Sequence, residues 1–374
     1  MIFSLPVLMY HSVSRHPHRL CVAPEVFEDH CRVLAGAGWR GIPLEEAETF
    51  FLRKRRLPRK VCLFTFDDGY LDNYVHAEPL LRRYGHRGAL FPVLGLLHEG
   101  DVLRPAGEDL GANGAPPAPL PNLDARAPVR NGNGLLVSPI VFCSWKEAAA
   151  MREKGAMDIA PHSMTHGRVA GDLKFTRLYL PGDRYSFFDV PPYPVPWGFP
   201  RFYLDHGLTH PGYTPAPELF DLIRAMVPQT PKEAQAFLSQ EKNREAVVGA
   251  VNRLPCLGTR ESMEEYRARV AAEFAACREQ CLARLGFAPV SFCWPWGDYT
   301  SVARKEGRKA GFRVFFTTYR GANVPGVAGA VRRIAVRNCS GADLLSLVRG
   351  ASSALRELPH DLGRILHRFW NAPG

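Results

Sequence analysis

Short apolar runs that alternate with helical patterns constrain the fold of this 374-residue chain more than any other feature. The runs are rich in β-branched, aromatic or leucine residues, and most are bounded by Gly, Pro or charged residues. Strands that are apolar throughout are typical of parallel sheets covered by helices. We therefore predict an α/β fold, a distorted or incomplete (β/α) barrel, with strands at 5–10, 61–66, 89–94, 290–294 and 312–317.

Two of the predicted helices carry end signals as well as periodicity. The first covers 144–154 and begins at Ser144, and Glu147 follows three residues later, which is the pattern of a capping box. The second covers 263–285, repeats apolar residues every three or four positions, and meets Gly286, a residue type that commonly terminates helices. A further helix is predicted at 24–37.

Two insertions interrupt the barrel domain that we predict for residues 1–341. Residues 99–134 are crowded with Gly, Pro, Ala and Asn and lack periodicity, which indicates a long loop. Residues 168–258 are predicted to form a largely helical insertion, a lid or a substrate-recognition subdomain. Its aromatic residues fit either a ligand cleft or a small core of its own. Residues 342–374 are predicted to form an amphipathic helical tail.

The formal net charge of +10 is compatible with an anionic partner such as nucleic acid, a phosphorylated lipid carrier or an acidic membrane surface. The basic residues are otherwise scattered, and the dense run Arg53–Arg56 is typical of a solvated face, so we predict no nucleic-acid partner. The tail places arginines among apolar positions near Phe369 and Trp370. We expect it to pack on the barrel, with peripheral contact to an anionic membrane as the alternative.

The N-terminal residues lack the basic segment of a signal peptide, and no run approaches the ~18 apolar residues that span a bilayer. We therefore expect a cytoplasmic protein, or one held peripherally at the inner face of the membrane. The nine cysteines include no CxxC pair and mostly have apolar neighbours, so we expect free, buried thiols rather than a cysteine zinc site.

Two adjacent carboxylates follow one of the predicted strands. Asp67 and Asp68 come directly after the apolar run 61–66, at the end of the strand where active sites of α/β folds gather. Adjacent residues leaving a strand point in different directions, so one carboxylate can bind a metal while the other faces substrate. Gly69 then permits a sharp turn. An ordinary polar turn is the alternative interpretation, since Asp-Gly is common in turns.

Two histidines lie four residues apart in the segment His162-Ser163-Met164-Thr165-His166. If this segment makes a helical turn, both imidazoles lie on one face, a spacing suited to a single divalent metal. With Asp68 they would complete a set of two histidines and one carboxylate that leaves positions open for water, as in catalytic metal sites. We predict a divalent cofactor, with Zn²⁺ as the expected ion and Co²⁺, Ni²⁺ or Mn²⁺ as alternatives.

These motifs resemble those of the polysaccharide deacetylase family, the NodB homology group of carbohydrate esterase family 4. Residues 65–69 resemble its first motif, 162–166 its second and 293–297 its third. The resemblance implies a NodB-type barrel in which Asp68, His162 and His166 hold the metal. It also implies that Asp67 is the general base.

Two departures from the family pattern concern the groups around this centre. The third motif has Cys293 where the family has an arginine, so the residue that orients Asp67 must come from elsewhere; Arg332, Arg333 and Arg337 are candidates. The late motif that ends in a histidine is absent, and His360 resembles it only superficially. The chain is closest to the subgroup that resembles deacetylases of exported poly-N-acetylglucosamine. That subgroup has a Tyr-His pair at its N-terminal strand, which implies His11 as the catalytic acid.

The resemblance implies hydrolysis of an N-acetyl or other N-acyl group on a sugar, with a metal-bound water as nucleophile. The expected substrate is an N-acetylated polysaccharide or a sugar carried on a polyprenyl phosphate. Trp294, Trp296, Asp298 and Arg333 are the predicted substrate-binding residues, and the backbone N–H of Trp296 is a candidate oxyanion donor. Two alternatives remain: a deformylase of a lipid-linked formamido sugar, and a glycan-binding protein with weak or no catalytic activity.

Overall fold

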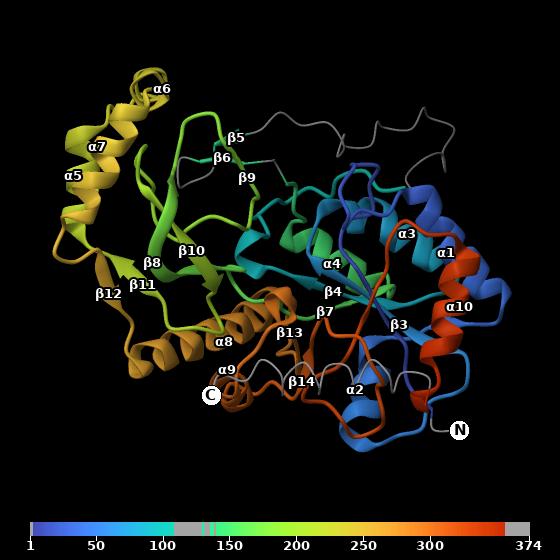
Figure 1. Cartoon of the computed structure of the whole chain (residues 1–374). Coiled ribbons are helices and arrows are strands. Elements are labelled where there is room, and N and C mark those ends of the chain that lie inside the picture. The colour runs from blue at the N-terminus through green and yellow to red at the C-terminus, as the bar shows by residue number, and fades with distance from the viewer. Residues whose placement is uncertain (1–2, 108–128, 131–134, 138–139, 356–374) are drawn as a thin grey trace.

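A parallel sheet forms the centre of the molecule (Figure 1). The computed structural model describes residues 3–107, 129–130, 135–137 and 140–355. The strand order is β15–β1–β3–β4–β7, with β2 paired to the beginning of β3, and every pairing is parallel. The strands are β1 (Val7–Tyr10), β2 (Arg40–Gly41), β3 (Val61–Asp68), β4 (Gly88–Pro92), β7 (Met157–Ile159) and β15 (Ile334–Ala335).

Two further strands continue the sheet towards a barrel. β13 (Ser291–Cys293) and β14 (Val314–Phe316) pair in parallel. The Cys293 N–H donates to the Pro161 carbonyl at 3.0 Å, just beyond β7, and Phe316 bridges to Val331, just before β15. Further backbone hydrogen bonds join Phe315 and Thr317 to Val331, but within the described residues β13 and β14 form no strand ladder with the central sheet, so the barrel is incomplete, as the sequence predicts. All five predicted strands are present.

Helices cover the sheet, and the residues at their ends explain where several of them begin and stop. Both Ser144 and Ser262 form capping boxes, with Glu147 and Glu265 respectively, and Gly286 ends its helix in a left-handed conformation with φ of 75°. The helices are α1 (Pro24–Gly36), α2 (Leu44–Arg53), α3 (Glu78–Arg83), α4 (Trp145–Glu153), α8 (Met263–Leu285), α9 (Ser301–Lys309) and α10 (Gly341–Ala351), with short turns η1 (Asn73–Ala77), η2 (Leu94–Leu96) and η3 (Pro295–Gly297).

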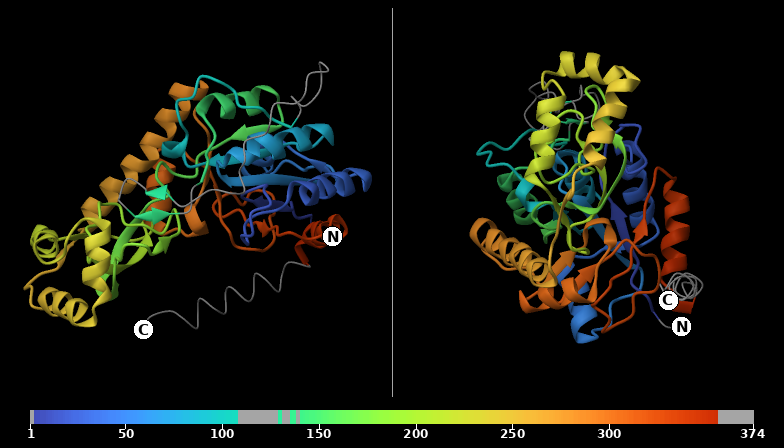
Figure 2. Two further views of the ribbon diagram at one scale, coloured as in Figure 1. Left: turned by 90° about the horizontal axis from the view of Figure 1, so that it is seen from above. Right: turned by 60° about the vertical axis from the view of Figure 1, so that its left-hand side comes forward.

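The insertion forms a second layered unit at one end of the elongated molecule (Figure 2). An antiparallel sheet in the order β10–β8–β11–β12 lies beside three helices, and a small sheet β5–β6–β9 adjoins it. Its elements are β8 (Arg168–Leu178), β9 (Arg184–Tyr185), β10 (Pro200–His206), β11 (Tyr213–Pro215), α5 (Pro217–Met226), α6 (Pro231–Ser239), α7 (Glu241–Asn252) and β12 (Gly258–Arg260), with β5 (Val129–Arg130) and β6 (Leu136–Val137) from the preceding loop.

This composition corrects the expectation of a largely helical insertion. The helical patterns at 217–226 and 231–254 are confirmed, with a break at Gln240. The preceding residues, which include the aromatic and proline-rich stretch 185–213, instead contribute the antiparallel strands β8 and β10. Those strands have a packing reason: Trp197, Phe199 and Phe202 are buried in a core that the insertion forms for itself. Most of its aromatic residues therefore serve packing rather than a ligand cleft.

The segments that were expected to be loop and tail are described only in part. α10 packs against α1, so the beginning of the tail does cover the barrel. Residues 356–374, including His360, Phe369 and Trp370, and most of 108–134 lie outside the described residues. Within the part of the chain that the structure describes, no helix is long and apolar enough to cross a membrane.

Candidate active site

The predicted catalytic and metal-binding side chains meet at the carboxyl ends of the parallel strands. Asp67 and Asp68 are the last residues of β3, and His11 directly follows β1. His162 and His166 lie in the loop that leads from β7 to β8. Both aspartates and both loop histidines are at most 5% exposed. Parallel strands bring their carboxyl ends to one edge, which is why residues so far apart in sequence converge.

Asp68, His162 and His166 form a compact group of possible metal ligands. Their ligand atoms all lie within 4.8 Å of one another. The Nε2 atoms of His162 and His166 lie 3.6 and 3.7 Å from the same Asp68 oxygen. Two atoms bound tetrahedrally to one zinc ion at 2.0–2.2 Å lie about 3.3–3.6 Å apart. The spacing and the chemistry of the three side chains therefore fit a divalent cation such as zinc.

A loop, not a helical turn, brings the two histidines together. Residues 160–167 contain no helix, so the conditional prediction of a helical turn was wrong about local structure. Ser163 and His166 instead adopt positive φ values of 73° and 50°, and the Ser163 hydroxyl accepts a hydrogen bond from the His166 N–H at 2.8 Å. Asp68 and Trp296 also have positive φ values, of 72° and 55°. Left-handed backbone costs about 1–3 kcal/mol per non-glycine residue, and such conformations cluster at functional sites.

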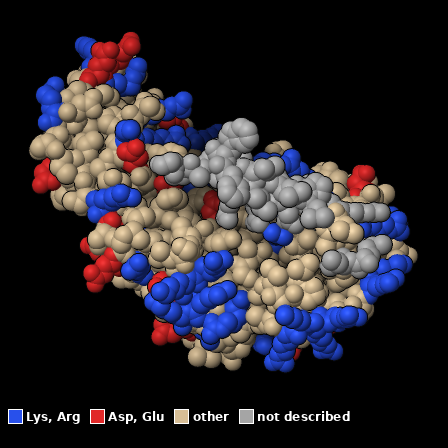
Figure 3. Space-filling view, turned by 60° about the horizontal axis from the view of Figure 1, so that its bottom comes forward, with Lys and Arg blue, Asp and Glu red and all other residues tan. Residues whose placement is uncertain are grey.

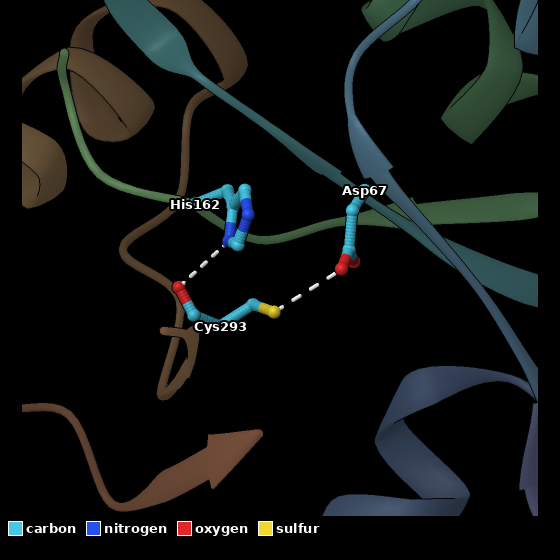
Figure 4. Close-up of side chains that lie close together, drawn as sticks. All are labelled: Asp67, His162 and Cys293. Atoms are coloured by element: carbon cyan, nitrogen blue, oxygen red, sulfur yellow. Dashed lines mark hydrogen bonds between the residues drawn. The ribbon is translucent and has the colours of Figure 1, made fainter. Parts of the chain in front are cut away.

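Cys293 lies between the two halves of the site (Figure 4). Its carbonyl is 2.9 Å from His162 Nδ1, which directs Nε2 towards Asp68, as a supporting hydrogen bond commonly does for a metal-binding histidine. Its Sγ lies 3.7 Å from Asp67. Cys293, Asp67 and His162 could in principle hold a cation too. Burial raises the pKa of the Cys293 thiol well above its usual value, so the neutral thiol makes this the poorer ligand set.

Arg333 holds Asp67 in place. Its guanidinium donates two hydrogen bonds to the carboxylate, at 2.6 Å to Oδ1 and 2.7 Å to Oδ2, and its Nε donates to the Thr317 carbonyl at 2.7 Å. The Arg333 side chain is fully buried. The predicted role of Arg333 in substrate binding is therefore corrected, because every part of the guanidinium faces protein. Instead it holds both Asp67 oxygens from the position directly before β15, while Cys293 stands where the resemblance implies an arginine.

Asp67 and Asp68 differ in their electrostatic surroundings. Burial alone would raise the pKa of Asp67, but the Arg333 guanidinium, with smaller effects from His162 and His11, holds this pKa well below its usual range. Burial and the adjacent charge of Asp67 raise the pKa of Asp68 to about 7. Asp67 is therefore a fixed anion, whereas Asp68 gains most from a bound cation, which favours its ionised form.

His11 is a second partner of Asp67, and it carries a positive charge only when it is protonated. Its Nε2 is 3.9 Å from Asp67 Oδ2. Burial lowers the pKa of His11 to about 4, against the charge of Asp67, which raises it. At neutral pH the imidazole is therefore uncharged and can receive a proton before it donates one.

A cleft of about 510 Å³ opens beside His166. One side comes from the insertion, with Phe187, Phe188 and His206, and the other includes Trp296 and Asp298. Trp296 therefore lies where substrate binding was predicted. Trp294 does not, because it is wholly buried and packs among Phe274, Phe292 and Phe315. This corrects its predicted contact with substrate.

The insertion contributes one residue to the cleft that the sequence did not reveal. His206, at the end of β10, stacks on the Trp296 ring at 4.3 Å with an interplanar angle of 8°. Its Nδ1 lies 2.9 Å from Asp298, which also accepts a hydrogen bond from the Tyr319 hydroxyl at 2.8 Å. The bond to His206 lowers the pKa of Asp298. No local motif marks His206, and only its place in the aromatic stretch of the insertion was a hint.

A family model for polysaccharide deacetylases matches residues 54–177, a segment that contains Asp67, Asp68, His162 and His166. A putative polysaccharide deacetylase, YxkH, from Bacillus subtilis (strain 168) is 38% identical over 89 residues. That match covers 24% of this chain and 32% of the relative, so the chain spans about a third of the length of this relative.

Two solved structures share the fold. IcaB from Ammonifex degensii superimposes with a TM-score of 0.52 and 19% identity over 93% of this chain and 97% of that one. A de-N-acetylase from Aggregatibacter actinomycetemcomitans has a TM-score of 0.57 and 18% identity over 92% and 99%. At these identities the similarity to the two solved structures shows a shared fold only. The family model, in contrast, matches the segment that contains the aspartates and histidines. Residues 54–177 therefore match the polysaccharide deacetylase family, and the fold of the chain is similar to that of these two solved structures.

Proposed function

We propose that this protein is a metal-dependent carbohydrate N-deacetylase that hydrolyses an N-acetyl group on a glycan, releasing acetate and a free amine. The observation that carries the proposal is the meeting of two chemically distinct aspartates. Asp68 shares a possible cation site with His162 and His166, and Asp67, directly beside it, is held as an anion by Arg333. A site that only bound a metal or a glycan would not need this second, oriented carboxylate.

Asp67 is assigned as the general base. Arg333 fixes both oxygens of its carboxylate, so the group cannot rotate away from the water that it deprotonates. That water adds to the amide carbonyl carbon, and backbone donors such as the N–H of Trp296 stabilise the negative oxygen, at about 3–4 kcal/mol for a well-placed donor. The cleft beside His166 gives the sugar a site next to Trp296.

His11 is assigned as the group that protonates the leaving nitrogen. Because its pKa is about 4, His11 is neutral in the resting protein and must first acquire a proton. Asp67, whose pKa lies below that value, lies 3.9 Å away and can pass on the proton it has taken from water. The proton then moves to the nitrogen as the C–N bond breaks, and both carboxylate and imidazole return to their starting states.

Asp68, His162 and His166 are assigned to hold the cation, with Zn²⁺ as the first candidate. When bound, a divalent cation at these residues would polarise the amide carbonyl and make a nearby water more acidic. His162 is supported in this role by the Cys293 carbonyl, which fixes its orientation.

The test is acetate release from N-acetylated oligosaccharides, with Zn²⁺ or Co²⁺ added to metal-free protein. We expect Asp67→Asn to reduce turnover at least a hundredfold while one equivalent of metal still binds, as measured by elemental analysis. Asp221→Asn, an exposed aspartate on α5, is the matched control and should behave as wild type. Metal binding without turnover on any N-acylated sugar would refute the proposal and favour a glycan-binding protein.

A sugar carried on a polyprenyl phosphate is the second substrate to test, and a formamido sugar the third. Both would use the same base and cation site, so comparison of acetate and formate release separates deacetylation from deformylation. A soluble oligosaccharide and its lipid-linked form, assayed side by side, separate a polymer substrate from a carrier-bound one.

A further inference from the structure

The positive charge of this chain is concentrated in two segments. Residues 51–60 contain six Lys and Arg and no acidic residue, and residues 301–313 contain five and a single Glu. These segments account for the whole net charge of +10, because the rest of the chain has 36 basic and 36 acidic residues. The basic residues are therefore not evenly scattered, although the sequence had suggested that they were: acidic and basic residues balance over most of the chain, and two segments are strongly basic.

The fold places these two segments on one surface, although about 250 residues separate them in sequence. The loop before β15 connects them. Gly326 donates a backbone hydrogen bond to Phe50 of α2 and lies against the Lys54 side chain, while Gly329 lies beside the guanidinium groups of Arg304 and Arg308 on α9. Figure 3 shows Lys and Arg side chains gathered along this face over α2 and α9. We call the surface made by Arg53–Arg56, α9 and this loop the basic face.

The charges on the basic face are exposed and largely unneutralised. All four side chains of Arg53–Arg56 are exposed, and none forms an ion pair with another described residue. On α9, Lys305 and Arg308 are exposed as well, and the one acidic residue, Glu306, is mostly buried and pairs with Lys309. A surface of this kind attracts a polyanion from a distance of about one Debye length, roughly 8 Å at physiological ionic strength.

Large apolar side chains are exposed among these charges. Leu52 precedes the arginine run and is 43% exposed, and Val327 follows Gly326 and is 50% exposed. Aliphatic side chains surrounded by Lys and Arg are typical of surfaces that insert shallowly between anionic lipid headgroups. Binding to single-stranded nucleic acid would favour exposed aromatic rings for base stacking, and within the described chain the large exposed aromatic residue is Tyr203, on β10 of the insertion.

We propose that the basic face docks this protein on an anionic lipid bilayer, with Arg53–Arg56 and α9 contacting headgroup phosphates and Leu52 and Val327 entering the headgroup layer. The proposal does not depend on the deacetylase activity. It assigns membrane contact to a surface of the barrel, independently of the C-terminal tail. Each Lys or Arg near an anionic surface contributes about a fivefold change in partitioning at low salt.

The experiment is co-sedimentation of the full chain with vesicles of phosphatidylcholine alone and of phosphatidylcholine mixed with phosphatidylglycerol. The test variants replace Arg53, Lys54, Arg55 and Arg56 with Ser, or Leu52 and Val327 with Ser. The matched control replaces Lys174, Arg177, Lys242 and Arg253 with Ser, which removes the same charge from exposed sites on the insertion. Circular dichroism and turnover of a soluble oligosaccharide verify that each variant is folded.

We expect wild type and the insertion control to bind only the vesicles with phosphatidylglycerol, and salt to weaken that binding. The four-residue basic variant should lose at least tenfold in partitioning, and the Leu52→Ser, Val327→Ser variant should bind less at high salt, where the apolar contribution dominates. Equal binding of the basic variant and wild type would overturn the proposal, because another surface would then be responsible. Binding to a DNA or RNA duplex in the absence of vesicle binding would overturn it in favour of a nucleic-acid partner.

Discussion

The buried pair of Arg333 and Asp67 allows a quantitative test of how this site is built. Both side chains are almost completely inaccessible, with 0% and 2% exposure, and two short hydrogen bonds join them. Removing one partner of such a pair leaves an uncompensated buried charge and typically costs about 3–5 kcal/mol. We expect Asp67→Asn to fall at the lower end, about 3 kcal/mol, because Asp68 can then ionise more readily and partly balance Arg333.

The assay is urea denaturation of metal-free protein, with Asp67→Asn, Arg333→Gln and the double variant forming a thermodynamic cycle. The double variant replaces the ion pair by two neutral amides that can still hydrogen-bond. We expect it to be more stable than the sum of the single effects predicts, by about 2–3 kcal/mol, yet to remain inactive. Additive effects within about 0.5 kcal/mol would refute the reasoning, since they would mean that the two residues are not energetically coupled.

The same pair predicts the direction of the pH dependence. The pKa of Asp67 is lowered on folding, so its contribution to stability is present above the unfolded pKa of about 3.9 and is lost as the pH falls below it. The Asp67 contribution to the stability difference between wild type and Asp67→Asn should therefore be lost only in acid stronger than about pH 4. From pH 5 towards neutral pH the difference should narrow, because burial and the charge of Asp67 raise the pKa of Asp68 to about 7 in wild type, and the part of this penalty on ionised Asp68 that comes from Asp67 is relieved in the variant. A difference that is smaller at pH 5 than at pH 7 would contradict these pKa directions.

Three further outcomes are expected. Burial raises the pKa of Glu48 to about 7, with its hydrogen bond to Ser291 opposing the shift, so folding disfavours its ionised form; Glu48→Gln should raise the midpoint of thermal unfolding at pH 8 more than at pH 5. His206→Ala should raise KM for a glycan without affecting the amount of metal bound, and Asp298→Asn should reproduce part of this effect, whereas an unchanged KM would exclude His206 from the substrate site. Zn²⁺ at a hundred times its Kd should stabilise wild type by about 2.7 kcal/mol in thermal-shift measurements, and His166→Ala should abolish most of that gain.

Much of the architecture follows from local patterns along the chain. The strands were predictable because a strand buried on both faces must be apolar at nearly every position, as in 61–66. The end of the long helix α8 was predictable to its last residue, since Gly286 is an end signal that acts through neighbouring backbone groups. Asp67 and Asp68 were predictable as site residues for a related reason: they follow a buried strand directly.

The group that orients Asp67 could be narrowed but not identified from sequence. Three arginines near the last strand, at 332, 333 and 337, were equal candidates, and only the pairing of β15 with β1 determines that Arg333 reaches across to the carboxylate. Trp294 and Trp296 are similarly close in sequence. The Trp294 ring is buried, whereas the Trp296 ring lines the cleft, and Trp296 has a positive φ. The neighbouring residue types do not specify this backbone conformation.

The sequence by itself determined the α/β class and the helix ends at Ser144 and Gly286, because these depend on interactions between near neighbours. It also indicated the four residues at the centre, through the spacing of two short motifs and their resemblance to a known family. The tertiary structure decided what surrounds that centre. His206 reaches the cleft because the insertion folds back beside His166, and the charges of 51–60 and 301–313 become one surface because the loop at Gly326–Gly329 lies between them. Both depend on contacts between residues far apart in the chain, whose geometry no local pattern contains.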